Sequence, residues 1–380
     1  MNFRKVVFWC HLIVGCLAGI VILVMCITGV LLAYQRQIIH VAERRFVVAD
    51  APSSPRLPLE KLFESVHEVE PDIPTSVIWR AEHGAPVEMF FSRDRSLLVN
   101  PYNGAVVGRG AVGTRAFFHK AEDFHRWLAV AAAHRAGGRT ITGACNLGFL
   151  FLVLSGPYLW LPRTWSRAAL RAGSWFNGKL TGKARDFNWH NVVGSWCCIP
   201  LAVIVVCAVA MSYPWANNLV YRVTGNAPPP AQNANRGEAG ADAGRPRKNA
   251  AAILASWAGL EALRVRAEQR VPDWQTISLR LPASADAQAV FTIDSGSGGR
   301  PDKRAQLTFD RKSDAEAKWE PFSSYNSGRR ARAWMRFAHT GEAGGVAGQT
   351  IAATVSLGGA FLVWTGLSLA IRRLWARITR

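Results

Sequence analysis

The sequence predicts a four-helix transmembrane bundle, all-α within the membrane, that carries two α+β domains on its outer, periplasmic side. Three observations lead to this fold class. Apolar residues make up 49% of the 380 residues, but they gather in four blocks of about twenty residues, the length that crosses a bilayer core of ~30 Å. On one side of these blocks basic residues outnumber acidic ones by twelve to one, and the chain contains an internal parallel repeat. This distribution excludes a fully soluble globule, a disordered chain and a nucleic-acid-binding module.

The four apolar blocks define the expected transmembrane (TM) helices. The first block, 6–34, has no charged residue and is longer than the apolar core of a cleavable signal peptide. The first half of the chain is expected to contain TM helix 1 at 1–40, an α+β domain at 41–118, an interfacial helix at 119–139 and TM helix 2 at 140–162. A cytoplasmic loop at 163–188 leads to the second half. That half is expected to contain TM helix 3 at 189–213, an α+β domain at 214–333, an interfacial segment at 334–349, TM helix 4 at 350–371 and a cytoplasmic tail at 372–380.

The net charge of +19 follows largely from membrane topology. In a four-span protein the N-terminus, the loop 163–188 and the tail 372–380 lie on one side, and together they hold twelve basic residues and one acidic residue, Asp186. Lys and Arg accumulate on the cytoplasmic side of membrane proteins. Both termini are therefore expected in the cytoplasm. The protein is expected to contact membrane lipid. Its positive charge is explained without binding to nucleic acid.

The two halves of the chain repeat each other in the same direction. His11 and His190 each open an H-x-x-V-G motif, at an offset of 179 residues. Gly156 and Gly366 belong to a second matched pair of segments, at an offset of 210 residues. Parallel repeats are related by an axis along the membrane normal. Such an axis would place His11 and His190 opposite one another at equal depth.

Each outward segment is expected to fold as a small α+β unit. Alternation of apolar and polar residues, as in 276–281, is typical of a strand. The first unit is predicted to have a helix at 59–69 and strands at 76–80, 87–92 and 96–99, and the second a linker at 228–235, a helix at 251–270 and strands at 275–281, 289–294 and 305–310.

His11 and His190 are the first candidate cofactor ligands. A single histidine at the end of a span is ordinarily structural, but two at symmetric positions on facing helices favour a shared partner. Bis-imidazole ligation of a b-type haem iron requires this arrangement. The glycine four residues after each histidine, Gly15 or Gly194, is expected to leave room for a flat macrocycle.

The outer face offers a second candidate pair for a second haem. His125 and His339 head equivalent aromatic and basic segments of the two halves. His134 could replace His125 as the ligand, and His119 and His40 remain alternatives. Two haems stacked across one bilayer would form an electron path. Zinc is the competing metal, but isolated histidine pairs lack the three or four ligands that it prefers.

The remaining motifs do not indicate a further cofactor or catalytic site. Gly108–Gly113 satisfies GxGxxG without a βαβ frame, so this segment is expected to be a connector. All seven cysteines fall within or beside the apolar blocks, and the absence of CxxCH excludes covalently attached haem. His67 and His83 are interpreted as surface residues, and no catalytic residue can be named.

The motifs resemble those of the PepSY-associated transmembrane helix family. The matching residues are Trp9, His11 and Gly15, Thr28-Gly29, Phe124-His125-Arg126-Trp127, Leu159–Arg163, Trp189-His190, Gly194, His339-Thr340-Gly341 and the PepSY-like segment 100–108. Within that family the chain resembles most the inner-membrane ferrisiderophore reductases of the FoxB type. The resemblance implies a haem-dependent oxidoreductase that passes electrons from a cytoplasmic or membrane donor to ferric siderophore in the periplasm, releasing Fe(II).

Two other function classes fit the same organisation. The first is a permease for the siderophore or its iron chelate, which is disfavoured because the spans lack the charges and helix breaks that carriers use. The second is a non-enzymatic regulator, in which the PepSY-like domains bind a periplasmic partner. An absorption spectrum separates the haem reductase from both.

Overall fold

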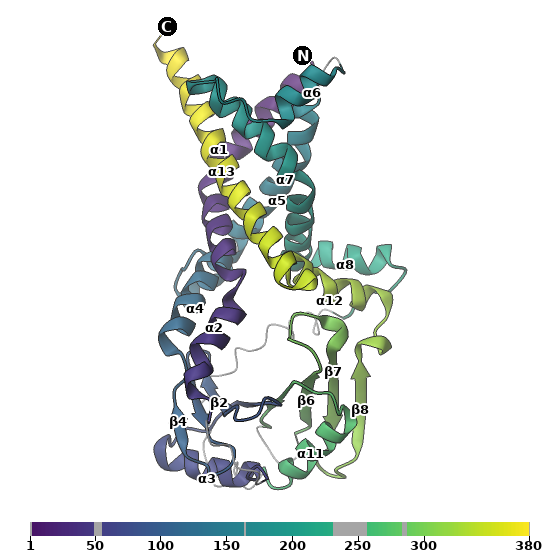
Figure 1. The fold of residues 1–380 in the computed structure, drawn as a ribbon. Coiled ribbons are helices and arrows are strands. Elements are labelled where there is room, and N and C mark those ends of the chain that lie inside the picture. Colours follow the sequence, from purple (N-terminus) through teal and green to yellow (C-terminus); the bar gives the residue numbers. More distant parts are fainter. Residues whose placement is uncertain (1, 49–54, 163–164, 231–256, 283–286, 380) are drawn as a thin grey trace. The chain divides into compact units, whose positions relative to one another are not determined.

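The computed structural model describes residues 2–48, 55–162, 165–230, 257–282 and 287–379. It divides into two compact units. The membrane unit comprises 1–35, 117–223 and 331–380, and the sheet unit comprises 36–116 and 224–330. Each half of the chain therefore contributes to both units (Figure 1).

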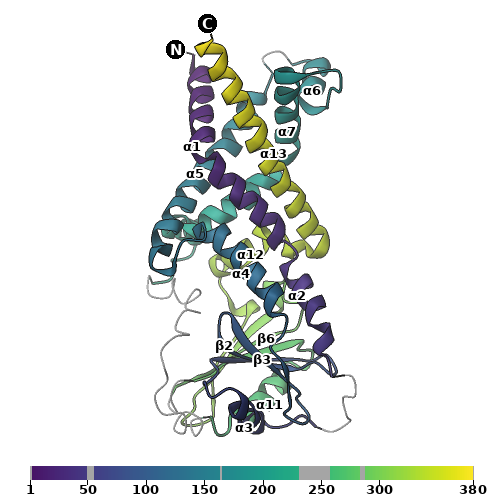
Figure 2. The same ribbon diagram turned by 90° about the vertical axis from the view of Figure 1, so that its left-hand side faces the viewer.

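The membrane unit is built on four long helices (Figures 1 and 2). They are α1 (Phe3–Leu32), α5 (Arg135–Trp160), α7 (Gly182–Ser212) and α13 (Gly345–Ile378). Each belongs to a helical segment that is long and apolar enough to cross a membrane, so the chain is a membrane protein. The helices pack in the cyclic order α1, α5, α7, α13. The repeat-related helices α1 and α7 therefore lie on opposite sides of the bundle.

Four shorter helices flank the bundle helices. They are α4 (Val112–Trp127) before α5, α6 (Arg167–Ser174) and α8 (Pro214–Val223) on either side of α7, and α12 (Ser327–His339) before α13. The predicted interfacial helix 119–139 corresponds to α4 together with the first turn of α5. The interfacial segment predicted at 334–349 corresponds to the end of α12 and the start of α13.

Two helices of the membrane unit extend beyond the predicted spans. Helix α7 begins at Gly182, inside the predicted cytoplasmic loop, and α13 continues to Ile378, inside the predicted tail. The predicted spans stop at the ends of the apolar blocks. A helix can continue past that point because Lys and Arg lay their aliphatic stems along the helix and keep their charge in water.

The sheet unit is built on one antiparallel sheet of eight strands. The strands are β1 (Ser76–Arg80), β2 (Val87–Ser92), β3 (Arg95–Val99), β4 (Val106–Gly108), β5 (Thr276–Arg280), β6 (Ala289–Asp294), β7 (Arg304–Phe309) and β8 (Glu316–Pro321). Their order is β4-β3-β2-β1-β5-β6-β7-β8. Each half is thus a helix followed by a four-stranded meander, with α3 (Leu59–Val69) before β1 and α11 (Leu260–Arg270) before β5.

Both halves share this sheet and one hydrophobic core, where the sequence predicted two separate domains. The halves join through β1 and β5, with Ile78 opposite Ser278. Alternate residues of the strands, such as Met89 and Phe291, face α3 and α11 in a single cluster. The part of the predicted helix at 251–256, and most of the linker 228–235, lie outside the described residues.

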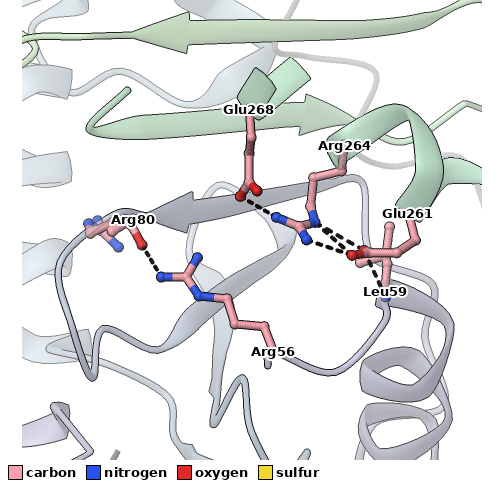
Figure 3. Close-up of polar contacts among 6 residues, drawn as sticks. All are labelled: Arg56, Leu59, Arg80, Glu261, Arg264 and Glu268. Carbon is pink, nitrogen blue, oxygen red and sulfur yellow. Dashed lines mark hydrogen bonds and ion pairs between the residues drawn. The ribbon is translucent and has the colours of Figure 1, made fainter. Parts of the chain in front are cut away.

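A cluster of charged side chains connects the helices of the two halves (Figure 3). Helix α3 follows Pro58, whose side chain gives no hydrogen bond to the helix. Glu261 Oε2 of α11 fills this position by accepting a hydrogen bond from the Leu59 N–H at 3.2 Å. Arg264, which is 6% exposed, donates to Glu261 at 2.6 Å and also to Glu268. The buried guanidinium is therefore paired on two sides, as a charge in an apolar core requires.

Candidate functional site

Four histidines of the membrane unit share one local arrangement. His11 lies near the start of α1 and His190 near the start of α7, while His125 and His339 lie at the C-terminal ends of α4 and α12. Each ring forms a hydrogen bond through Nδ1 to an oxygen atom of a neighbouring helix.

The two inner histidines have equivalent partners. His11 Nδ1 lies 2.8 Å from Ser155 Oγ on α5, and His190 Nδ1 lies 2.9 Å from Thr365 Oγ1 on α13. Ser155 and Thr365 are 210 residues apart, the offset that also relates the glycines following them. The two halves therefore reproduce the hydrogen bond as well as the histidine.

The outer histidines are held at matching levels of α1 and α7. His125 Nδ1 lies 2.9 Å from Thr28 Oγ1, and that hydroxyl lies 3.1 Å from the carbonyl oxygen of Met25. His339 Nδ1 lies 2.9 Å from the carbonyl oxygen of Ile204, which is 179 residues after Met25. In the second half a cysteine occupies the position of Thr28. The ring there bonds the carbonyl directly instead of through a hydroxyl.

These partners determine which ring nitrogen carries the proton. The carbonyl of Ile204 can only accept, so His339 donates through Nδ1–H. The hydroxyls of Thr28, Thr365 and Ser155 each donate to a carbonyl in the preceding turn of their own helix, at 2.7–3.4 Å, and so accept from the rings. Within the described residues, no hydrogen bond involves Nε2 of the four rings. When such a ring is neutral, Nε2 keeps its lone pair, as in metal-ligating histidines.

The outer pair is in ring contact. The ring centroids of His125 and His339 are 6.2 Å apart, with an interplanar angle of 59°. Two imidazoles bound to one metal from opposite sides, with bonds of about 2 Å, have ring centroids roughly 6 Å apart. The separation of this pair therefore fits a single metal ion between the rings.

The inner pair is less close. His11 and His190 lie on opposite helices of the bundle, near enough for their rings to interact electrostatically. No ring contact joins them in the part of the chain that the structure describes. Sequence reasoning ranked this pair first because of its shared offset, whereas the geometry is more complete for His125 and His339.

The alternative outer ligands do not share the arrangement. His134 ends the short helix Ala132–His134 and is exposed, and His40 is exposed on α2 (Gln35–Glu43) of the sheet unit. His119 is half-buried on α4, two turns before His125. The geometry favours His125 over all three as the partner of His339.

The donor set fits a haem better than a protein-only metal site. Among the described residues, no group of three or more His, Cys, Asp or Glu side chains could hold a metal ion, so a zinc site of the usual kind has no ligands here. A haem iron needs only axial ligands from the protein, and the two imidazoles of a histidine pair match that number.

The glycines near the rings differ from the expectation. A Cβ atom on Gly15 or Gly194 would meet a leucine of the neighbouring helix at 3.9 or 3.7 Å, so these glycines lie at helix contacts rather than at an opening for a macrocycle. The glycines against the inner rings are Gly156 and Gly366, where a Cβ atom would lie 3.9 Å from His11 Cε1 and 3.4 Å from His190 Cε1. Gly156 and Gly366 align in the sequence, but only the structure places them against the histidine rings.

Comparison with protein families gives a match over nearly the whole chain. The model of the family described as PepSY-associated TM region matches residues 8–373, which include α5, α7, the sheet unit and most of α1 and α13. No curated protein matches the chain.

Proposed function

The chain belongs to the PepSY-associated TM region family, and on this premise we propose that it is a di-haem membrane reductase. It takes electrons from the cytoplasmic side of the bacterial inner membrane and delivers them to ferric siderophore in the periplasm, releasing Fe(II) for iron uptake. One observation carries the proposal: four histidines lie at two levels of the bundle, each with Nδ1 hydrogen-bonded to a neighbouring helix and, within the described residues, with no hydrogen bond at Nε2.

The two pairs have separate roles in this proposal. His125 and His339 would hold one b-type haem, and His11 and His190 the other. A bound haem supplies one-electron chemistry that no side chain of the pairs provides. The chain itself fixes the four rings, because each Nδ1 hydrogen bond sets the orientation of an imidazole and makes its Nε2 a stronger ligand.

The spacing of the two levels suits transfer across a membrane. Along α1, His11 and Thr28, the partner of His125, are 17 residues apart, which corresponds to roughly 25 Å of helix rise. A hydrocarbon core is ~30 Å thick. Between the levels the helices bury apolar side chains such as Ile22 and Val205, which keep water from the path and tune the potentials of the bound groups.

We also propose that both termini are cytoplasmic. They lie at the same end of the bundle in Figure 1, and basic residues gather there. Arg4 of α1 donates to the carbonyl of Leu161 at 2.8 Å, and Arg372 of α13 lies 3.4 Å from Asp186 of α7. Alkaline phosphatase fused after Arg171 should be inactive and the same fusion after Asn226 should be active. The reverse pattern contradicts this orientation.

The spectrum of the purified protein tests the haem and the activity in turn. We expect Soret and α bands that respond to dithionite, followed by reoxidation when a ferric siderophore is added, with Fe(II) captured by a chelator. A colourless preparation would favour the permease or the regulator. Haem that stays reduced against every ferric siderophore would indicate another haem function.

A further inference from the structure

The sheet unit contains a pocket of about 430 Å³. It lies where the turn between β6 and β7 meets the end of β8 and the first turn of α12. Its lining combines apolar and aromatic side chains, such as Ile293, Trp319 and Phe322, with the cations Lys303 and Arg330. Pockets of ~300–1,000 Å³ with mostly apolar walls and a few polar groups are typical of small-molecule sites.

The pocket carries an uncompensated positive charge. Within the described residues, neither Lys303 nor Arg330 forms a salt bridge, although the charge of Lys303 contributes to the lowered pKa of Asp302. The guanidinium of Arg330 donates to the carbonyl of Ser323. The lining also contains Asp302, but both of its oxygens accept from Arg300, at 3.0 and 2.7 Å. These hydrogen bonds lower the pKa of Asp302, so its charge is already paired.

The other charged residue of the lining is paired as well. Arg304 donates to Asp294 at 2.8 Å and to the carbonyl of Gly298 at 2.7 Å. Lys303 and Arg330 therefore remain as two cationic donors beside aromatic walls. Lys and Arg bind oxyanions through charge-assisted hydrogen bonds, and Trp and Phe rings favour contact with another ring.

We propose that this pocket binds a small organic anion with an aromatic ring, of the catecholate or aromatic carboxylate class. The ring packs against Trp319 and Phe322, and its anionic oxygens accept hydrogen bonds from Lys303 and Arg330. Resting on the proposed reductase function, this site favours ferric chelates with catecholate groups over uncharged hydroxamate chelates.

Binding to the full-length protein in detergent tests the proposal without any need for haem reduction. The probe is 2,3-dihydroxybenzoate, and its uncharged amide, 2,3-dihydroxybenzamide, is the matched ligand. By calorimetric titration we expect the acid to bind about tenfold more tightly than the amide, with an affinity that falls as salt rises. The pair Lys303→Gln and Arg330→Gln should remove this preference.

Two variants control for folding. Lys303→Gln alone changes an exposed side chain and should weaken binding without lowering the unfolding temperature. Lys61→Gln, on the exposed face of α3 and paired with Glu64, should leave binding unchanged. Equal affinity of the double variant and the wild type, or no binding of the acid by the wild type, would overturn the proposal.

Different results would contradict the pocket proposal and the proposed reductase function. If the acid binds at the pocket but haem is not reoxidised by any ferric siderophore, the proposed function is wrong and the pocket remains. If ferric catecholate is reduced with the same KM by the wild type and the double variant, the reductase remains and the pocket proposal is wrong.

Discussion

The hydroxyl of Ser155 accepts a hydrogen bond from Nδ1 of His11 at 2.8 Å, between helices that are far apart in the sequence. The same contact recurs between Thr365 and His190 at 2.9 Å. A histidine that only filled space at a helix end could use either nitrogen. Both halves use Nδ1 and leave Nε2, which is the arrangement expected of ligands.

Substituting the four proposed haem ligands should reveal which histidines act as pairs. His125→Ala or His339→Ala should lose about half of the bound haem, and the double variant no more, because two ligands of one iron act as a unit. His11→Ala and His190→Ala should behave in the same way. Combining His11→Ala with His125→Ala should remove nearly all haem, measured as pyridine haemochrome per protein.

The exposed His67 of α3 provides the control for these substitutions. His67→Ala should keep the full haem content. If all four single variants also keep full content and an unchanged spectrum, the four histidines are structural and the haem assignment is wrong.

The hydroxyl groups that bond histidine Nδ1 should influence the midpoint potential of the proposed haem and not its retention. Thr365→Val preserves the shape of a buried side chain but removes the acceptor for His190 Nδ1–H. A less basic imidazole stabilises Fe(III) less, so one midpoint potential should become more positive while haem content stays unchanged. Thr365→Ser should restore the wild-type potential. A redox titration measures both variants.

The exposed Thr354, on the same helix, is the matched control. Thr354→Val should not shift either potential. Equal potentials for the wild type and Thr365→Val would mean that this hydroxyl has no influence on a haem ligand.

The sequence predicted the elements better than their assembly. The strands at 76–80, 87–92 and 289–294 were placed correctly, because their apolar residues alternate with a period of two. The edge strands β4 and β8 were missed, since β4 has only three residues and β8 alternates charged residues without a buried face. The pairing of β1 with β5 was also missed, because a strand's pattern does not indicate which distant strand forms its neighbour.

The candidate site was predictable to a similar extent. The repeat identified His11 and His190, but it gave no information on their partners until the helices were placed side by side. One signal was present, since Ser155 and Thr365 precede the aligned pair Gly156 and Gly366. His125 and His339 are not separated by either offset of the repeat, so the sequence supported this pair only weakly. The contact between the two rings is visible only in the structure.

Removing Glu261 should weaken the connection between the two halves of the sheet unit. Glu261→Ala leaves the Leu59 N–H without its acceptor and Arg264 with one carboxylate fewer. An unsatisfied buried polar group costs about 1–3 kcal/mol, so the unfolding temperature should fall clearly in calorimetry of the full-length protein.

The control is the exposed pair Lys61–Glu64 on α3. Glu64→Ala should lower the unfolding temperature much less than Glu261→Ala, because water screens exposed ion pairs. Equal unfolding temperatures for the two variants would mean that the Glu261 contacts contribute little to stability.

Glu88 should make the stability of the sheet unit depend on pH. The side chain is 1% exposed on β2, with Oε1 2.5 Å from Arg115 Nη2 and 3.3 Å from Ser96 Oγ, and Oε2 3.5 Å from Arg80 Nη2. Burial raises the pKa of Glu88, and Glu43, which shares Arg115, adds to the effect while the two arginines oppose it. The folded state therefore holds the Glu88 proton at a pH where the unfolded chain has lost it.

The sign of the effect follows from this difference. Above about pH 4.3, the ordinary pKa of a glutamate, the unfolded state binds fewer protons than the folded state, so the free energy of unfolding falls as pH rises through the raised pKa of Glu88. Glu88→Gln removes this slope. The stability of the wild type relative to Glu88→Gln should therefore decrease as pH rises above about 4.3, measured by thermal unfolding over a series of pH values.

Glu320 offers a control with the opposite sign. Partial burial acts to raise its pKa, but hydrogen bonds from Arg329 and Lys318 are stronger together and lower it. Its contribution is present above the unfolded pKa and is lost as pH falls through the folded one, so the stability of the wild type relative to Glu320→Gln should shrink only in acid. If the wild type instead gains stability over Glu88→Gln as pH rises, the ion pair with Arg115 outweighs burial, and Glu88 is a permanently charged anchor for α4 rather than a titrating group.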